Sequence, residues 1–454
     1  MNLNIRDVLL KKTQSRCPLC LTVCPAEVWR TGGFQPQVFL RRICPDHGEA
    51  SVCIASDARF HWLSVGKPGN SRECGPGLCI SSDGCHQGTL GRNANPGEAL
   101  GVMNKLSTCL ALIEIVNSCN LSCPTCYANS PHGTGHVVDA VPLENLKERI
   151  QGVIDRKGKI EILQLSGGEP TLHPQFFELL HWLHANPGID YVLLNTNGVR
   201  IANDDDFKSR LAGGFQYGKF QLYLQFDGTH EAGQKNLRGA DLRTTRQRCL
   251  ERCAEMQLPV TLAMTVTHEN LAGLWDAVEF GLGYSNVRGI SFQPIFGSGR
   301  IPSPPKTRLN MADVILAAVS QSSGKLKFED FTPLPCGDPN CATIGYLLKV
   351  GGQTRSVSDF IDFKNLQDFL GTKIRYKLED LIKCGCESEP LGELLRLFEL
   401  DETHTFRLFI KPFMDAFTWD EDRIDRCCTH VIRPDGQLDS FCRYYSGFAD
   451  CQKK

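Results

Sequence analysis

The middle of the chain alternates between short apolar runs and stretches with helical periodicity, and this alternation limits its possible folds more than any other feature of the sequence. Apolar runs of strand length occur at 112–116, 161–166, 191–195, 221–226, 260–266 and 289–293. Such runs are typical of parallel strands that are buried on both faces. Helical periodicity follows at 142–156, 173–185, 205–211, 241–256 and 270–281. Six strand–helix units predict an α/β fold with a parallel sheet, and because the closed barrel of this type has eight units, we expect an open, partial (β/α)6 barrel.

The length and charge of the chain limit its class further. At roughly 150 residues per domain, 454 residues predict about three domains, and 41% hydrophobic residues are enough for a large core. The 49 lysines and arginines nearly balance 51 aspartates and glutamates, so no nucleic-acid partner is expected. The sequence shows no apolar run near the roughly 18 residues of a transmembrane helix and no N-terminal signal-peptide core. We therefore expect a cytoplasmic protein.

Cysteine is concentrated at the two ends of the chain. Twelve of the 22 cysteines fall in the first 126 residues. Structural disulfides are rare in the cytoplasm, so metal binding is the leading explanation. We expect four regions, namely a rubredoxin-like or zinc-ribbon-like metal-binding module at 1–60, an auxiliary iron–sulfur segment at 61–110, the partial barrel at 111–301, and a C-terminal region with an auxiliary iron–sulfur cluster at 302–454.

Three cysteines follow the first predicted strand with spacings of four and three positions: Cys119, Cys123 and Cys126. Three thiolates from one loop can bind three irons of a 4Fe-4S cluster and leave the fourth iron open to a small molecule. The alternative is a structural zinc or iron–sulfur knuckle whose fourth ligand lies elsewhere in the sequence. An open iron would make these three cysteines catalytic as well as structural.

The cysteine loop resembles the cluster-binding loop of the radical S-adenosylmethionine (SAM) enzymes. The end of the second strand carries Gly167, Gly168, Glu169 and Pro170, which is similar to the Gly-Gly-Glu-Pro segment of that superfamily. We expect the two glycines to let the backbone approach a ligand and Glu169 to accept a hydrogen bond from the amine of SAM. The resemblance implies SAM and a 4Fe-4S cluster as cofactors, and a small electron-donor protein of the flavodoxin or ferredoxin type as partner.

Polar residues at the other predicted strand ends are further candidates for SAM contacts. Asn195 and Gln225 are the best of these, and Thr265, His268 and Gln293 are weaker. Asn197 and Asp227 stand before glycines, where turn formation explains them equally well. The superfamily usually has an aromatic residue directly before the third cysteine, whereas here Thr125 stands there and the aromatic residue follows as Tyr127. We expect Tyr127 to be one of the cofactor contacts.

Other cysteines form sets of about four. Cys17, Cys20, Cys44 and His47 have the spacing of two knuckles for zinc or a single iron, with Cys24 or Cys53 as alternatives to His47. Two auxiliary 4Fe-4S clusters are predicted from the remaining sets, which are Cys74, Cys79, Cys85 and Cys109, and then Cys336, Cys341, Cys442 and one of Cys427 and Cys428. Cys249 and Cys253 lie one helical turn apart, where packing is the better explanation.

Over nearly its full length, from about residue 17 to 445, the chain resembles the tetraether lipid synthase group, whose relatives were earlier interpreted as methylases of a pterin precursor. The resemblance implies C–C bond formation on long-chain lipid, with peripheral membrane contact. Modification of a small molecule such as a pterin precursor, or of a peptide, is the alternative, and an iron–sulfur or zinc protein without catalysis is a third hypothesis. Phe406, Phe409, Phe413 and Phe417 recur at helical spacing and are either core or one wall of an apolar substrate groove.

Overall fold

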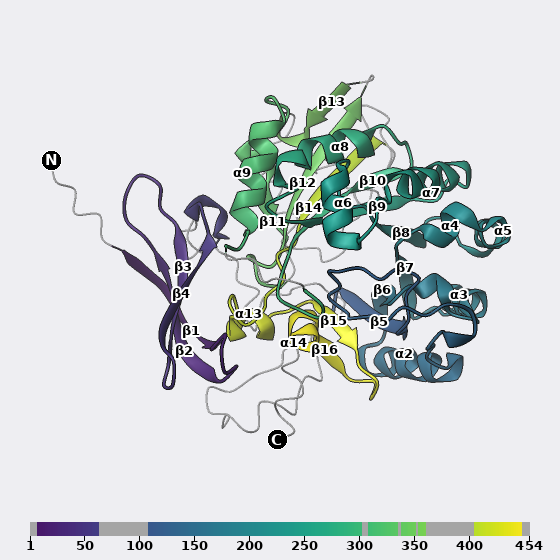
Figure 1. Cartoon of the computed structure of the whole chain (residues 1–454), viewed down its shortest axis with the longest axis horizontal. Coiled ribbons are helices and arrows are strands. Elements are labelled where there is room, and N and C mark those ends of the chain that lie inside the picture. The colour runs from purple at the N-terminus through teal and green to yellow at the C-terminus, as the bar shows by residue number, and fades with distance from the viewer. Residues whose placement is uncertain are drawn as a thin grey trace.

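A computed structural model describes residues 7–62, 108–301, 307–334, 337–350, 353–359 and 404–446. Within these ranges the chain forms two sheets (Figure 1). The smaller sheet comes from the N-terminal residues and lies at one side of the molecule. The larger sheet is the predicted α/β structure and contains the candidate site.

The N-terminal module is a four-stranded antiparallel sheet in the order β1-β2-β3-β4. Its strands are β1 (Val8–Arg16), β2 (Val23–Arg30), β3 (Val38–Cys44) and β4 (Gly48–Ala55), and the 3₁₀ turn Ala58–Phe60 follows. Alternation of side chains along the strands puts a small apolar core on one face, built from Ala26, Val28, Val38, Leu40, Ala55 and Ala58. Such a core is small for an independent domain, so bound metal and contacts with the rest of the chain are expected to stabilise it.

Six parallel strands form the centre of the larger sheet, as the sequence predicts. They are β5 (Leu110–Val116), β6 (Ile160–Gly167), β7 (Ile189–Thr196), β8 (Phe220–Gln225), β9 (Val260–Val266) and β10 (Val287–Pro294). The helices that cover them are α2 (Leu143–Lys157), α3 (Phe176–Ala185), α4 (Val199–Asn203), α5 (Asp205–Gly214), α6 (Glu231–Arg238), α7 (Arg243–Glu255) and α8 (Leu274–Leu282). The five predicted helices are confirmed, and α4 and α6 are short additions at strand ends.

The C-terminal region contributes to the same sheet. It contains α9 (Met311–Gln321), β11 (Thr332–Pro333), β12 (Thr343–Val350), β13 (Gln353–Ser356), β14 (Thr405–Ile410), α13 (Glu421–Asp425), β15 (Thr429–Ile432), β16 (Leu438–Ser440) and α14 (Phe441–Tyr445). β14 pairs in parallel with β10, and β15 pairs in parallel with β5. Both edges of the six-stranded barrel are therefore extended by strands from far along the chain (Figure 1).

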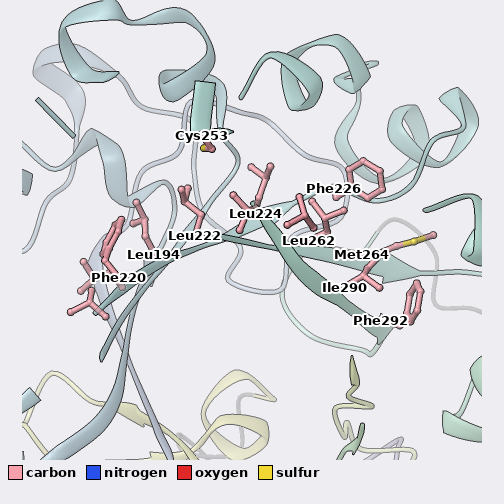
Figure 2. Packing of buried hydrophobic residues seen from close by; sticks show 14 of the residues in the cluster. Leu194, Phe220, Leu222, Leu224, Phe226, Cys253, Leu262, Met264, Ile290 and Phe292 are labelled. Carbon is pink, nitrogen blue, oxygen red and sulfur yellow. The ribbon is translucent and has the colours of Figure 1, made fainter. Parts of the chain in front are cut away.

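The hydrophobic core lies between the strands and the outer helices. Leu222 and Leu224 of β8 point toward α7, which carries Cys253 (Figure 2). Cys249 and Cys253 are fully buried in this core, so the prediction that they serve packing is confirmed. In the described residues no helix is long and apolar enough to cross a membrane.

The helical spacing inferred for the C-terminal phenylalanines is wrong, because Thr405–Ile410 is a strand. Alternation along this strand turns Phe406 into the core, where it is fully buried, and turns Phe409 toward the interior of the barrel. Phe413 lies after the strand and also faces that interior, whereas Phe417 is exposed at the surface. Phe409 and Phe413 therefore line the interior of the barrel, whereas Phe406 and Phe417 do not.

Candidate active site and metal centres

A cavity of about 720 Å³ occupies the interior of the large sheet. It runs the length of the barrel strands, from Glu161 and Asp190, near the strand starts, to the cysteine loop beyond the strand ends. One wall carries amide and hydroxyl side chains, among them Gln164, Asn195, Gln221, Gln225 and Thr265. The lining also carries apolar side chains, largely from the C-terminal region, namely Phe296, Ile344, Phe409, Phe413 and Phe441, together with the charged Arg288, Arg407 and Lys411.

All three cysteines of the predicted cluster loop line this cavity. The loop is held by backbone hydrogen bonds, since Cys119 N–H donates to Pro131 O (2.9 Å) and Cys126 exchanges two bonds with Arg300 (2.9 and 2.8 Å). Arg300 Nε also donates to the carbonyl oxygen of Cys123 (2.8 Å). The loop is thus fixed by hydrogen bonds to its backbone.

Burial makes the thiols of Cys119 and Cys123 poor anions without a bound cation. Burial raises the pKa of Cys119 to about 12, and it also raises that of Cys123, where the nearby Arg238 guanidinium acts in the opposite sense. Arg238 is itself buried and forms an ion pair with Asp227, with N–O distances of 2.6 and 2.9 Å. Thiolates become stable in such a place when they bind metal, and the arginine reduces the cost of their charge. Three thiols from one loop on one wall match the donor set of a 4Fe-4S cluster with one open iron.

The two glycines of the Gly-Gly-Glu-Pro segment are required by close contact between strand ends. Gly167 has a φ of +115°, and a Cβ there would lie 2.1 Å from Val116 O. At Gly168 a Cβ would lie 2.0 Å from Ser118 O. The sequence-based reason, approach of the backbone to a ligand, is therefore incomplete, because the first partner is the chain that leads into the cysteine loop. Both glycines also line the cavity.

Glu169 faces inward from the same segment and is 1% exposed. Its carboxylate accepts hydrogen bonds from Thr171 Oγ1 (2.7 Å), Thr196 Oγ1 (2.7 Å) and the backbone N–H of Asn197 (2.7 Å). Neither Glu169 nor Pro170 contributes to the cavity wall. The structure thus presents the glycine backbone to the cavity and uses Glu169 to tie two strand ends together, while its contact with SAM stays a prediction.

Asn195 and Gln225 lie on the cavity wall, as expected for ligand contacts. Asn195 Nδ2 donates to Ser166 Oγ (3.2 Å) and to the Tyr127 hydroxyl (3.4 Å). Gln225 Oε1 accepts from Arg246 (2.7 Å), a fully buried arginine of α7. Tyr127 also lines the cavity, beside the cysteine loop.

The other residues that the sequence offers as SAM contacts divide into two groups, one close to the cluster loop or the cavity and one outside it. Asn197 reaches the cysteine loop, since its Nδ2 donates to Asn120 Oδ1 (2.6 Å) and contacts Cys119 Sγ (3.7 Å), and Thr265 and Gln293 lie on the cavity wall. Asp227 has a φ of +62° and pairs with Arg238, so it serves the turn and the ion pair. His268 lies outside the cavity lining and contacts Thr307.

The N-terminal module brings together a second set of ligands. The ligand atoms of Cys17, Cys20, Cys44 and His47 all lie within 4.8 Å of one another. Hydrogen bonds with Thr22 lower the pKa of Cys20 to about 6, which favours the thiolate that a metal needs. Cys24 is buried beside this group, and Cys53 lies on β4, but neither belongs to it. The geometry therefore selects His47 from the alternatives that the sequence left open.

Comparison with protein families agrees with this geometry. Residues 113–281 match the model of the radical SAM superfamily, and residues 9–56 match that of the HMPTM N-terminal zinc ribbon domain. The barrel is a radical SAM domain. Bound to such a domain, a 4Fe-4S cluster supplies one electron that cleaves SAM to methionine and a 5'-deoxyadenosyl radical.

Similar proteins were found over different shares of the chain. The 7,8-dihydro-6-hydroxymethylpterin dimethyltransferase of Methanocaldococcus jannaschii is 27% identical over 96% of this chain and 93% of its own. A GTP 3',8-cyclase of Chlorobaculum tepidum is 36% identical over 20% of this chain and 26% of its own. Among solved structures, Streptococcus suis SuiB bound to SAM has a TM-score of 0.36 at 14% identity, with 48% of this chain and 45% of that chain covered.

The C-terminal cysteines of the described residues are Cys341, Cys427, Cys428 and Cys442. Cys341, Cys427 and Cys442 lie close enough for electrostatic interaction, and burial raises the pKa of Cys427 to about 11 and that of Cys442 to about 12. Cys428 lines the main cavity together with Cys109, whose backbone N–H donates to Cys428 O (2.9 Å), and its Sγ also lies beside Gly337, where a Cβ would be 3.3 Å away. The predicted ligands Cys74, Cys79, Cys85 and Cys336 lie outside the described residues.

Sequence reasoning missed three arginines around the radical SAM site: Arg238, Arg246 and Arg300. Arg246 had a usable signal, because it precedes Cys249 by three residues and Cys253 by seven, on the buried face of α7. A charged residue on an apolar helix face needs a partner in the sheet. Arg238 and Arg300 follow no pattern of this kind and are identified by the structure.

Proposed function

We propose that this radical SAM enzyme removes hydrogen from an unactivated carbon of a long apolar chain and forms a C–C bond there. The shape and lining of the cavity support this proposal most directly. Its aromatic and aliphatic wall, from Ile344 of β12 and Phe409 of β14 to Phe413, gives a hydrocarbon chain apolar contact. The cavity also extends along the barrel strands, which gives an extended chain more room than a compact substrate needs.

The chain's own residues would position the reaction. The three loop cysteines would hold the cluster, and the backbone of Gly167 and Gly168 together with Asn195 and Gln225 would bind SAM. The apolar wall would keep water from the reacting carbon. A small electron-donor protein would supply electrons, and a lipid substrate would require contact with a membrane surface.

The proposal is tested with protein reconstituted anaerobically, SAM, dithionite and liposomes of lipids with long isoprenoid chains. We expect the liposomes to increase formation of 5'-deoxyadenosine and to yield a product that has lost two hydrogens for each new C–C bond. Replacing Phe409 by Ala should weaken this increase, because it removes part of the apolar wall. Phe417→Ala is the matched control, since Phe417 is 39% exposed and lies outside the cavity. Liposomes without effect on SAM cleavage would contradict the proposal.

Methylation of a pterin precursor is the second candidate. It is favoured by the similarity to the dimethyltransferase of M. jannaschii, which extends over nearly the whole of both chains. Amide side chains on one wall, such as Gln221 and Gln225, could donate and accept hydrogen bonds with a heteroaromatic ring. Transfer of ¹³C from methyl-labelled SAM to 7,8-dihydro-6-hydroxymethylpterin would support this candidate over lipid coupling.

For the other cysteines we propose two auxiliary 4Fe-4S clusters. The interaction of Cys341, Cys427 and Cys442 supports a C-terminal site completed by Cys336. Because Cys427 interacts with both Cys341 and Cys442, we propose Cys427 rather than Cys428 as the ligand of that site. Cys109 faces the cavity and would join Cys74, Cys79 and Cys85 in the second site. Loss of about four irons per chain in a Cys427→Ala variant, but not in Cys428→Ala, would support this assignment.

A further inference from the structure

Two arginines line the main cavity near the strand starts, at the end away from the cluster loop. Arg407 belongs to β14, and Arg288 is the second residue of the neighbouring strand β10. The two strands pair in parallel with Arg407 opposite Gly289, so the arginines come from neighbouring positions of adjacent strands. The candidate SAM contact Gln293 lies four residues beyond Gly289, which is about 13 Å at the rise of a strand. This spacing separates the arginines from the predicted SAM contacts.

The guanidinium of Arg407 has no ionic partner in the part of the chain that the structure describes. The side chain is half-buried, and it forms no hydrogen bond or ion pair with any described residue. Arg288 differs, because its Nη1 donates to the carbonyl oxygen of Ser285 (2.9 Å). A guanidinium inside a cavity is stable when an anion supplies acceptors, and its planar fork matches a phosphate or a carboxylate. Arg407 is therefore the better candidate for binding an anion.

Two carboxylates line the cavity at the same end, and each has its own cationic partner. They are Glu161 of β6 and Asp190 of β7, both near the strand starts. Glu161 forms an ion pair with Lys157, and Asp190 forms one with Lys159 (2.7 Å). Neither carboxylate pairs with Arg407, so the charge of this arginine is not balanced within the described residues.

The surroundings of Arg407 leave room for a ligand and lead into the apolar part of the lining. A Cβ at Gly289 would lie 2.9 Å from the Cβ of Arg407, so Gly289 leaves space on the face that carries the guanidinium. Further along β14 the lining continues with Phe409, opposite Ile344 of β12, and then with Phe413. This order, cationic near the strand starts and apolar toward the cysteine loop, fits an amphipathic molecule whose chain points at the loop.

We propose that Arg407, with Arg288 beside it, binds the anionic headgroup of an amphipathic substrate. The headgroup is a phosphate or a carboxylate, and its binding here directs the apolar chain toward the loop of the three cysteines. This assignment rests on the proposed function, because it names the polar end of the long-chain substrate. A lipid with the same chains but no charge lacks this anchor and should bind more weakly.

Two lipids with the same isoprenoid chains test the assignment, one with a phosphate headgroup and one that ends in the free alcohol. Each is given to reconstituted protein in micelles of an uncharged detergent with SAM and dithionite, and 5'-deoxyadenosine formation is measured against lipid concentration. We expect the KM of the phosphate lipid to be lower by about tenfold or more, because its headgroup accepts charge-assisted hydrogen bonds. Equal KM values in the wild type would overturn the assignment and leave the proposed function standing.

Variants of Arg407 test whether this residue is the anchor. Arg407→Gln should raise the KM of the phosphate lipid about tenfold and so remove most of the difference between the two lipids. Arg407→Lys keeps the charge and should keep much of the difference. Arg210→Gln is the matched control, because Arg210 lies on the outer helix α5 over the ring of Phe177 and does not line the cavity. A preference for the phosphate lipid that is unchanged in Arg407→Gln would overturn the role of Arg407.

Inorganic phosphate separates a headgroup site from a site for a free anion. Its binding to the wild type and to Arg407→Gln is measured by isothermal titration calorimetry, and we expect weak binding to the wild type that is lost in the variant. If phosphate binds in this way but both lipids have the same KM, the site takes a free anion and the headgroup assignment is wrong. If neither lipid increases 5'-deoxyadenosine formation, the proposed function fails, and the assignment that rests on it fails as well.

Discussion

Gly168 shows how a single residue joins two parts of the site. Its position leaves no room for a Cβ, which would lie 2.0 Å from the carbonyl oxygen of Ser118. We expect Gly168→Ala to lower the free energy of unfolding by roughly 1–3 kcal/mol, because the two strand ends must move apart. Urea unfolding measures this effect. Gly213→Ala in α5, where a Cβ would meet nothing within 4 Å, is the control and should be neutral or slightly stabilising. Equal stability of the two variants would contradict the close contact.

The buried side chain of His61 makes the free energy of unfolding depend on pH. Burial lowers its pKa from about 6.5 to about 3 in the folded chain. Because the folded pKa lies below the unfolded one, the stability contribution is present above pH 6.5 and is lost as the pH falls toward 3. At pH 5 the expected loss is roughly 2 kcal/mol. Urea unfolding at pH 7 and pH 5 should show a smaller difference for His61→Gln than for the wild type, while the exposed His181→Gln should behave like the wild type.

The residues of the site differ in how far the sequence predicts them. The spacing of Cys119, Cys123 and Cys126 is local, so their common loop is predictable, and all three line one cavity. Glu169 is different, because its partners Thr196 and Asn197 come from the next strand end. No local pattern shows that its carboxylate is already bonded within the protein. Contacts between segments that are distant in the sequence can be identified only from the three-dimensional structure.

At the scale of elements, Arg42 of β3 joins the N-terminal module to the segment after β14. Arg42 is 2% exposed, and its guanidinium donates to the carbonyl oxygens of Ala416 (2.9 Å) and Phe417 (2.6 Å). Lys11 of β1 adds ion pairs with Asp420 (2.7 Å) and Asp422 (2.8 Å). The metal-binding module thus supports the segment that begins at Phe413 on the cavity wall.

This contact leads to a prediction for Arg42→Met. The two carbonyl oxygens lose their donor, so we expect a cost of about 1–3 kcal/mol and faster amide hydrogen exchange in residues 413–423. Arg41→Met on the same strand is the control, since Arg41 makes exposed contacts with Asp7 and Trp29. Exchange in 413–423 that is unchanged in Arg42→Met would show that the module does not hold this segment.

The elements themselves were predicted well where periodicity is local. The six strands and five main helices follow from apolar runs and helical spacing. The pairing of β14 with β10 and of β15 with β5 was not predictable, because each strand joins a sheet edge formed more than 100 residues earlier. The phenylalanines of β14 also match a helical spacing by chance, and strand pairing decides their true alternation.

At the scale of the whole molecule, we expect the metal site of the N-terminal module and the cluster site of the barrel to act independently. The ribbon ligands Cys17, Cys20, Cys44 and His47 lie at the turns of the small sheet and are not among the residues that line the barrel cavity. We expect Cys17→Ser with Cys20→Ser to lose one zinc or iron per chain by elemental analysis, because two of four ligands are gone. Cleavage of SAM should continue in this variant. Cleavage abolished together with the ribbon metal would show that the two sites act as one.

The central claim is that the loop of Cys119, Cys123 and Cys126 holds the cluster that cleaves SAM. The most direct measurement is 5'-deoxyadenosine formed from SAM and dithionite, with iron and sulfide content, in reconstituted wild type and in the variant with all three cysteines replaced by Ala. We predict that the variant contains about four irons fewer per chain and forms no 5'-deoxyadenosine. Formation of 5'-deoxyadenosine by the variant at the wild-type rate would contradict the account.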